Sequence, residues 1–497
     1  MNKQAVVIGS GFAGMSAASF LARQGWQVTV VEKHHQPGGR ARRLQAAGFT
    51  FDMGPSWYWM PDVFERYFEQ FGRRVEDYYT LHRLNPSYRV YWPGDYWDIP
   101  ADYEALKALL NRVEPGAGAA LDKVMAEAAY KYQVGIHKLV FKPGQSWREF
   151  LDKDLLRGLL KLDVFTSIRR HFARHFKHAG IRELMEFPSL FLGALPQDTP
   201  ALYSLMNYAD IKGGTWFPEG GMYSIVQGMH RLAVELGVQF LFEAEARQIV
   251  LNGAKATGLT VTSAQGNTQT LTADVIVSGA DYHFTETQLL PASHRSYRQR
   301  YWDNRVMAPS CLLYYVGLNK KIEGLQHHSL FFDVPFGPHA QDIYSTPRWP
   351  DEPLFYVSAT SVTDASQAPP GCENLFFLVP VATGLPGDDE ALRMRYFNQI
   401  VQRFEQRLQT PIKDHIVFFK SYAGSNFIED YGALRGNAYG LANTLMQTAI
   451  LKPSCKSKKV SNLYYTGQLT VPGPGVPPSL ISGEVVAGLI QQNLSTR

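Results

Sequence analysis

A glycine-rich turn near the start of the chain has the spacing needed to hold a dinucleotide. The apolar run 5–8 leads into a G-x-G-x-x-G pattern formed by Gly9, Gly11 and Gly14. Gly9 permits a tight turn, Gly11 lets the backbone approach a pyrophosphate, and Gly14 lets a helix pack closely on the preceding strand. The same pattern occurs in ordinary glycine-rich turns, so its surroundings must decide between the two interpretations.

The residues that follow favour the dinucleotide. Residues 15–24 are rich in Ala and Leu and predict a helix, and the run 28–31 predicts a second strand that ends at Glu32. The free N–H groups at the start of such a helix, near Phe12 and Ala13, attract phosphate oxygens. Glu32 is placed to accept hydrogen bonds from an adenosine ribose. The segment therefore predicts a β-α-β dinucleotide-binding unit.

A second motif follows this unit and narrows the choice of cofactor. Gly38, Gly39 and Arg40 form a G-G-R loop, and Gly54-Pro55 follows a short strand-like segment. Both resemble motifs of the amine oxidase and carotenoid desaturase superfamily. The resemblance implies that the arginine loop lies along the pyrophosphate and ribitol of FAD, and that the second loop lies beneath the flavin. The alternative for the first loop is a type II turn with a surface arginine.

The C-terminal block carries the most specific resemblance, which is to the bacterial carotenoid desaturases of the phytoene desaturase type. The family pattern is a strand, a glycine, Pro-Gly-x-Gly with an aliphatic residue, and then a helix. Here it stands as Gly467, the run 472–476 and a helix expected from Ser479. Two departures occur, because the run 468–471 replaces the usual small residues and Thr-His, and Pro477-Pro478 follows the aliphatic position.

The resemblance implies a set of FAD contacts spread over the whole chain. Backbone contacts to adenine are expected near Arg247, and Gly220-Gly221 is expected close to the flavin ring. The complete expected cofactor set is Gly9, Gly11, Phe12, Ala13, Gly14, Glu32, Lys33, Gly38, Gly39, Arg40, Gly54, Pro55, Ser56, Arg247, Gln248, Ala280, Gly467, Gly475, Val476 and Pro477.

The chemistry implied by the resemblance is the desaturation of an acyclic carotenoid precursor, phytoene toward lycopene, with quinone or oxygen as electron acceptor. Hydride passes to the flavin, and the adjacent C–H of the resulting allylic cation is acidic enough for a weak base. We therefore nominate no catalytic side chain, and we predict no metal site because no Cys or Cys/His ligand spacing occurs.

Other functions on the same scaffold remain open at this stage. They are a C30 desaturase, a hydroxycarotenoid desaturase, a carotenoid oxygenase, a prenyl-chain saturase and an amine oxidase. A non-enzymatic prenyl-lipid carrier similar to the GDP-dissociation inhibitors is a further alternative. The intact dinucleotide and arginine motifs argue against a carrier, which has no need of a pyrophosphate cradle.

We predict an α/β protein with a discontinuous Rossmann-like FAD domain, a mixed-sheet substrate domain and a helical cap. Length supports this division, since 497 residues correspond to about three domains. The FAD domain is expected over 1–75, 213–288 and 455–497, the substrate domain over 76–130 and 289–454, and the cap over 131–212. In the substrate domain we expect strands near 311–316, 354–357, 375–379 and 415–419 and a helix over 389–408. A hairpin is expected through Asn252-Gly253.

Aromatic residues make up 13% of the chain, and they must pack either in the core or along a substrate channel. A hydrocarbon substrate has no polar group to recognise, so its channel must be apolar and selective by length and shape. Ordinary core packing is the competing interpretation for each aromatic run. The expected channel residues are Trp57, Trp59, Phe187, Phe191 and Tyr439.

The charge is small overall but uneven. The formal net charge of +4 argues against a nucleic-acid partner, yet residues 138–182 alone carry a net +7. Apolar residues recur there every three or four positions from Leu155 to Phe176, which predicts a basic amphipathic stretch that meets anionic lipid headgroups. A solvated basic face on a helical cap is the alternative.

The sequence shows neither a signal peptide nor an apolar run long enough to span a bilayer. Three cysteines lie far apart and predict no disulfide framework, which favours a reducing compartment. We therefore expect a cytoplasmic protein that lies peripherally on the inner face of the cell membrane.

Overall fold

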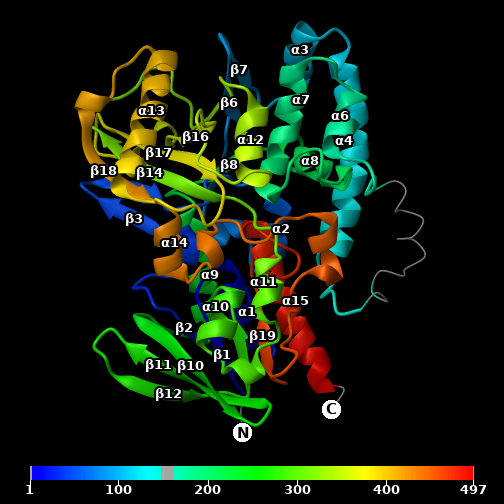
Figure 1. The fold of residues 1–497 in the computed structure, drawn as a ribbon, viewed down its shortest axis with the longest axis vertical. Helices are drawn as coiled ribbons and strands as arrows, with labels where there is room; N and C mark the ends of the chain where they lie inside the picture. Colours follow the sequence, from blue (N-terminus) through cyan, green and yellow to red (C-terminus); the bar gives the residue numbers. More distant parts are fainter. Residues whose placement is uncertain (1–2, 147–148, 150–161, 496–497) are drawn as a thin grey trace.

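The computed structural model describes residues 3–146, 149 and 162–495, without the side chains of 190–192 and 445. A five-stranded parallel sheet lies in the lower half of the molecule (Figure 1), with strand order β19-β13-β1-β2-β9. Its strands come from distant parts of the chain and are β1 (Gln4–Ile8), β2 (Gln27–Val31), β9 (Gln239–Leu241), β13 (Val275–Ser278) and β19 (Leu463–Tyr465). The α/β class with a discontinuous parallel sheet is confirmed.

Two helices pack together on this sheet and join the ends of the chain. Helix α1 (Phe12–Arg23) follows β1, and helix α15 (Val476–Ser495) lies against it. A Cβ at Gly14 would lie 2.0 Å from the Gly9 carbonyl oxygen, and one at Gly483 would lie 2.5 Å from the Ala17 nitrogen. Glycine is therefore required at both positions for close packing.

A seven-stranded mixed sheet forms the upper half of the molecule. Its order is β18-β14-β17-β16-β15-β6-β7, and the β15–β6 pair is parallel while the others are antiparallel. The strands are β6 (Tyr88–Trp92), β7 (Asp95–Ile99), β14 (Ser310–Leu318), β15 (His328–Phe331), β16 (Phe355–Ser358), β17 (Glu373–Val381) and β18 (Ile416–Tyr422). The strands expected near 311–316, 354–357, 375–379 and 415–419 are all present.

The two faces of strand β14 belong to two different apolar clusters of the protein. Successive side chains of a strand point to opposite faces. Leu312 and Tyr314 pack in the core beneath helix α13 (Glu390–Leu408), whereas Cys311 and Leu313 point to the face that meets the FAD-domain half. Because both faces are covered, the strand is apolar throughout.

Helices at the upper right of Figure 1 close one side of the molecule. They are α3 (Tyr103–Val113), α4 (Ala117–Val134), the π-helix η3 (Gly135–Leu139), α6 (Ile168–Ala173), α7 (Ala179–Glu186) and α8 (Leu205–Ile211). Helix α4 packs against both α3 and α8. The helical layer thus begins near Tyr103, although we had predicted that residues up to 130 belong with the substrate sheet.

The basic amphipathic stretch is not one continuous helix in the part that the structure describes. Its residues 147–148 and 150–161 lie outside the described residues, and after them α6 and the start of α7 at Ala179 are two separate helices. Leu162, Ile168, Phe172 and Phe176 are buried in the protein, so they do not form an exposed apolar face. Phe165 is the exception, with 86% of its surface exposed.

The remaining strands are short antiparallel groups. A three-stranded sheet of β10 (Ala244–Asn252), β11 (Lys255–Ser263) and β12 (Thr268–Thr272) includes the hairpin expected through Asn252-Gly253. Two pairs accompany it, β3 (Arg43–Ala46) with β4 (Phe49–Asp52) and β5 (Leu81–Arg83) with β8 (Trp216–Pro218). All three cysteines are free thiols.

Candidate active site

One cavity of about 1020 Å³ runs between the parallel sheet, the mixed sheet and the helical layer. It begins at the C-terminal ends of β1 and β2, where ligands bind in open parallel sheets. Its wall there contains Gly11, Glu32 and Gly39, and its far arm contains apolar side chains such as Leu202 and Met206. A polar cradle and an apolar arm therefore form a single space.

The cradle leaves room at the N-terminus of helix α1. Gly11 caps this helix without a side-chain hydrogen bond, so the first N–H groups of the helix are available to an anion. A Cβ added at Gly11 would have only Gly38 O and Gly39 Cα within 4 Å, both at 4.0 Å. The turn and the G-G-R loop are thus in close contact, and both line the cavity.

Glu32 is held rigidly at the edge of the cradle. Its Oε2 accepts hydrogen bonds from Ser10 N at 2.9 Å and Ser10 Oγ at 2.7 Å, and its Oε1 accepts one from His34 N at 3.0 Å. The side chain is buried yet lies in the cavity wall. A carboxylate has about four acceptor positions, so capacity remains for a ribose hydroxyl.

Arg40 also fits a phosphate-bearing cofactor. Its guanidinium lies in the cavity wall and 5.0 Å from the ring centre of Tyr431, and Nη2 donates to Asn437 O at 3.3 Å. Its buried Nε has no hydrogen-bond partner within the described part of the chain. Burial lowers the pKa of Arg40, and an anion in the cradle would restore the stabilisation that burial removes.

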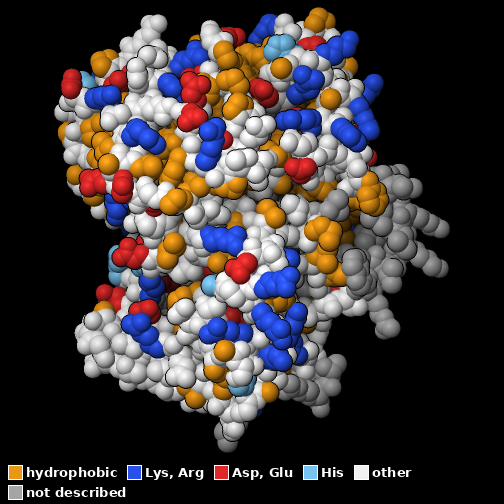
Figure 2. All heavy atoms as spheres, in the orientation of Figure 1, with side chains coloured by type: hydrophobic (Ala, Val, Ile, Leu, Met, Phe, Trp, Pro, Cys, Tyr) orange, Lys and Arg blue, Asp and Glu red, His pale blue; other side chains and the backbone are white. Residues whose placement is uncertain are grey.

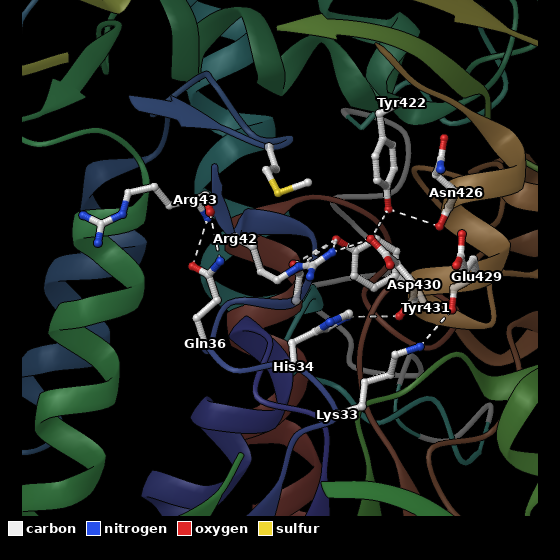
Figure 3. Close-up of polar contacts among 12 residues, drawn as sticks. Lys33, His34, Gln36, Arg42, Arg43, Tyr422, Asn426, Glu429, Asp430 and Tyr431 are labelled. Carbon is white, nitrogen blue, oxygen red and sulfur yellow. Dashed lines mark hydrogen bonds and ion pairs between the residues drawn. The ribbon is translucent and has the colours of Figure 1, made fainter. Parts of the chain in front are cut away.

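Helix α14 (Gly424–Tyr431) lies beside the cradle next to Lys33 and His34, a contact that no sequence pattern predicts. Figure 3 shows its residues pointing toward the end of β2 and the G-G-R loop. Arg42 Nη2 donates to Asp430 Oδ2 at 2.5 Å, and Lys33 Nζ donates to Glu429 O at 2.8 Å. Because these partners lie almost 400 residues apart in the chain, no local pattern could reveal them.

The loop expected beneath the flavin is packed tightly against the arginine loop. A Cβ at Gly54 would lie 2.6 Å from Arg40 O, so the two backbones are in contact. Asp52, just before it, accepts hydrogen bonds from Met222 N at 2.7 Å and Tyr223 N at 3.0 Å. Burial raises the pKa of Asp52 to about 6.

Gly220-Gly221, expected next to the flavin, is absent from the cavity wall as described. A Cβ at Gly221 would lie 2.9 Å from Asp52 Oδ2. The two glycines therefore allow the turn that packs against the Asp52 carboxylate, and they lie outside the wall of the cavity in which we expect the flavin.

Most residues expected to contact the cofactor lie in the wall of this one cavity. Contact with FAD itself stays a prediction for each of them. The wall contains Gly9, Gly11, Phe12, Ala13, Glu32, Lys33, Gly38, Gly39, Arg40, Gly54, Pro55, Ser56, Ala280, Gly467, Gly475, Val476 and Pro477. Gly14 lies behind the wall, because it packs against Gly9.

Arg247 and Gln248 are two expected cofactor residues that the structure does not bring to the cavity, and their contact with FAD stays a prediction. Both are exposed and outside the cavity wall, and Arg247 pairs with Glu245 at 2.8 Å. The wall is formed instead by the preceding residues of β10, Ala244 to Ala246. An irregularity in the pairing of β10 between Ala246 and Gln248 carries the chain away from the cavity at this point.

The apolar arm contains three of the five expected channel residues. Trp57, Trp59 and Tyr439 line the cavity together with Cys311 and Tyr356. Phe187 is buried and lies behind the wall, with its ring centre 6.1 Å from those of Trp57 and Trp59. The side chain of Phe191 lies outside the described residues.

Phe165 marks the outer end of the arm, since it lines the cavity and is 86% exposed. The cavity therefore opens at the protein surface next to an exposed aromatic ring. The opening lies beside residues 162–165 and the segment that ends at Leu451, both of which contribute to the wall.

Two polar side chains near the Pro-Gly-Pro-Gly loop were not anticipated. Lys452 Nζ and Asn443 Oδ1 are buried, and neither has a hydrogen-bond partner among the described residues. Both atoms lie close to Gly473, whose φ is +138°, at 3.3 and 3.0 Å from where its Cβ would be. Burial lowers the pKa of Lys452 to about 7. In the sequence, Lys452 stands next to a proline, and this pair of residues alone predicts no site.

The arrangement defines a class of protein. A parallel sheet with a pyrophosphate cradle and an attached apolar chamber is the architecture of an FAD-dependent oxidoreductase. The family model described as flavin containing amine oxidoreductase matches residues 12–491. The cofactor of this protein is FAD.

Comparison with known proteins places the chain more narrowly. It is 40% identical over 491 residues to the carotenoid 3,4-desaturase of Haloarcula japonica, with 98% of each chain covered. It is 32% identical to the zeta-carotene-forming phytoene desaturase of Myxococcus xanthus, covering 97% of this chain and 93% of that one. The chain belongs to the flavin-containing amine oxidoreductases and, within them, to the carotenoid desaturases.

Solved structures share the fold at low sequence identity. An oxidoreductase from Methanosarcina mazei superposes with a TM-score of 0.60 at 14% identity, over 98% of this chain and 100% of that one. The two proteins thus share the mixed α/β fold.

Proposed function

We propose that the protein is an FAD-dependent desaturase of an acyclic carotenoid. The observation that carries this proposal is the single cavity in which a dinucleotide cradle continues into an apolar arm lined by Trp57, Leu202 and Met206. A polyene in the arm would reach the flavin end of the cradle without crossing water. Sequence relationship to carotenoid desaturases supports the same substrate class.

The chain's residues hold the reactants and keep the site dry. When bound, FAD supplies the acceptor for the hydride that leaves the polyene. Glu32 and Arg40 hold the adenosine and pyrophosphate parts, and the Gly54 and Gly475 loops form the walls near the expected position of the flavin. Trp57, Tyr356 and Tyr439 surround the inner part of the arm and exclude solvent from the reacting carbons.

Two reactions compete for the detailed assignment. Desaturation of phytoene toward lycopene is the reaction that we expect from the sequence motifs. Formation of the 3,4-double bond is a second candidate, because identity is 40% to a 3,4-desaturase and 32% to a phytoene desaturase. The two differ in how far the end of the polyene must pass beyond the flavin.

The decisive experiment supplies both substrates. FAD-loaded protein is incubated with liposomes that contain either phytoene or lycopene, and the products are separated and identified by absorption spectra. A red-shifted product from phytoene supports the first reaction, and one from lycopene alone supports the second. If neither polyene is converted although the protein retains FAD and an electron acceptor is present, the proposal fails.

We further propose that the protein works at a membrane surface and passes electrons to quinone or oxygen. No helix among the described residues is long and apolar enough to cross a membrane. The exposed large hydrophobic residues include Phe165, Met446 and Leu451, of which Phe165 and Leu451 belong to the cavity wall.

Figure 2 shows hydrophobic side chains gathered over the segment between β18 and β19 on this face, with Lys and Arg side chains below them near α11 (Gln299–Asp303). An apolar opening next to basic side chains suits an anionic bilayer surface. A water-insoluble polyene could then enter the arm directly from lipid.

A further inference from the structure

We propose that Glu127, His171 and His175 form a binding site for a divalent transition metal, with zinc as the preferred ion. The site lies in the helical layer, outside the cavity that holds FAD and the polyene. It is independent of the proposed desaturase reaction. It revises our expectation of no metal site, which rested on cysteine and histidine spacing in the sequence alone.

The three side chains come from two helical segments that pack together. Glu127 lies on α4 and His171 on α6. His175 lies two residues beyond the end of α6, four positions after His171. One ligand atom from each residue lies within 4.8 Å of the other two, and His171 Nε2 is 3.8 Å from Glu127 Oε2. A histidine pair four residues apart presents both rings on one side of a helical turn.

His171 provides a second, independent indication of a ligand. The residue is only 2% exposed, and its Nε2 is buried without a hydrogen-bond partner among the residues that the structure describes. A buried polar atom without a partner is costly.

The charges around the site permit a cation. Lys131 is fully buried nearby, but its Nζ pairs with Asp163 Oδ2 at 2.9 Å and donates to Ser204 Oγ at 3.3 Å. Its charge is therefore already compensated within the protein. Glu127 is partly exposed and adds a negative charge, and the side chain of Arg174 is exposed to solvent.

The three ligand types favour zinc over calcium and magnesium. Two imidazoles and one carboxylate are a common set for zinc, with the fourth position left to water, whereas calcium and magnesium prefer oxygen ligands only. Tetrahedral zinc requires ligand atoms about 3.3 Å apart, from bond lengths near 2.0 Å. The present spacing needs small side-chain rotations, which the partly exposed Glu127 and His175 can make.

A metal here would tie α4 to α6. Helix α4 continues directly into η3, and Ile136 and Leu139 of η3 line the apolar arm of the cavity. Fixing α4 would therefore stabilise one wall of the substrate arm as well as the helical layer itself. The expected signature is a metal-dependent rise in the melting temperature.

The test uses the full-length, FAD-loaded protein after treatment with EDTA. Zinc chloride is titrated by calorimetry, and cobalt binding is followed by visible absorption. We expect one ion per chain, and at least tenfold weaker binding in His175→Ala and in Glu127→Gln. Both variants alter partly exposed residues, so both should fold with the same FAD content.

His137→Ala is the matched control. His137 Nε2 lies 3.6 Å from Asp62 Oδ2, and this pair contains only one histidine. Its removal should leave zinc affinity unchanged. Equal affinity in the parent, His175→Ala and Glu127→Gln proteins would overturn the proposal, as would the absence of any stoichiometric binding. A parallel loss in His137→Ala would show adventitious surface binding and would overturn it too.

Discussion

Arg42 and Asp430 form an ion pair of 2.5 Å that fastens helix α14 to the dinucleotide cradle. The arginine is 8% exposed and the aspartate 27%, so water screens the pair little. Tyr422 adds a hydrogen bond to the same carboxylate at 2.8 Å, and Tyr431 Oη donates to Gly39 O at 3.1 Å. The helix that covers the cradle is thus held by the residues that form the cradle.

Asp430→Asn should loosen this helix. The substitution leaves the Arg42 charge buried without its counter-ion, which costs on the order of 2 kcal/mol of folding free energy. We also expect weaker FAD binding, because Phe427 to Gly432 line the cavity. Urea unfolding and FAD fluorescence titration measure both effects. Lys420→Gln, at an exposed position of β18 outside the cavity wall, should change neither.

Gly11→Val should abolish FAD binding without unfolding the protein. The position has φ −71°, which any residue adopts, and open space around its Cβ, so only the cofactor would clash. Gly14→Ala should destabilise the fold itself, because a Cβ there would lie 2.0 Å from Gly9 O and push α1 away from β1. Flavin absorbance and circular dichroism distinguish the two. Normal FAD retention in Gly11→Val would contradict our assignment of the cradle.

Lys452 should make stability depend on pH. Its pKa is about 7 in the folded protein and 10.5 when free, so between these values the unfolded chain carries a proton that the folded chain lacks. Stability should therefore rise with pH through this window, by up to about 1.4 kcal/mol per pH unit, and be independent of this group below pH 7.

Lys452→Met should remove that slope, measured by urea unfolding at a series of pH values between 6 and 10. Lys255→Met, at the exposed first residue of β11, is the control and should leave the slope intact. An unchanged slope in Lys452→Met would mean that the amine is not buried in neutral form.

Met206→Trp should block the apolar arm while leaving the cradle untouched. Met206 lies on α8 in the cavity wall, and the larger ring would occupy the space expected for the polyene. We expect polyene turnover to fall at least tenfold with full FAD content. Val234→Trp, on the exposed face of α9 (Tyr223–Glu235), should have no effect. Full activity in Met206→Trp would place the substrate elsewhere.

Phe165→Asp should weaken binding to anionic liposomes. The ring is exposed at the opening of the cavity, where a carboxylate would oppose both the apolar acyl chains and the negative headgroups. Vesicle flotation at low and high salt measures the effect. Val362→Asp, which is 43% exposed and outside the cavity wall, provides the control. Equal flotation of all three proteins would argue against entry of the substrate from a membrane at this position.

Local sequence patterns predicted the dinucleotide unit and the strands of the second sheet. The glycine spacing at Gly9, Gly11 and Gly14 reports a backbone geometry that depends on neighbours close in sequence. The same holds for the helix expected over 389–408. The cofactor class follows from these short-range motifs together with the C-terminal loop around Gly475.

The tertiary structure decided everything that depends on distant contacts. Periodicity placed Leu162, Ile168 and Phe172 on an outer face, whereas packing against the rest of the helical layer buries them. The pairing of Arg42 with Asp430 and the isolation of Lys452 have no local signature.

The sequence by itself thus determined the β-α-β cradle and its cofactor, because local backbone geometry encodes both. Only the folded chain decided that the cradle opens into one apolar arm, that α14 covers it, and that Glu127 meets His171. Those relationships arise from burial and packing between segments that are hundreds of residues apart or on separate helices, and no short stretch of sequence contains them.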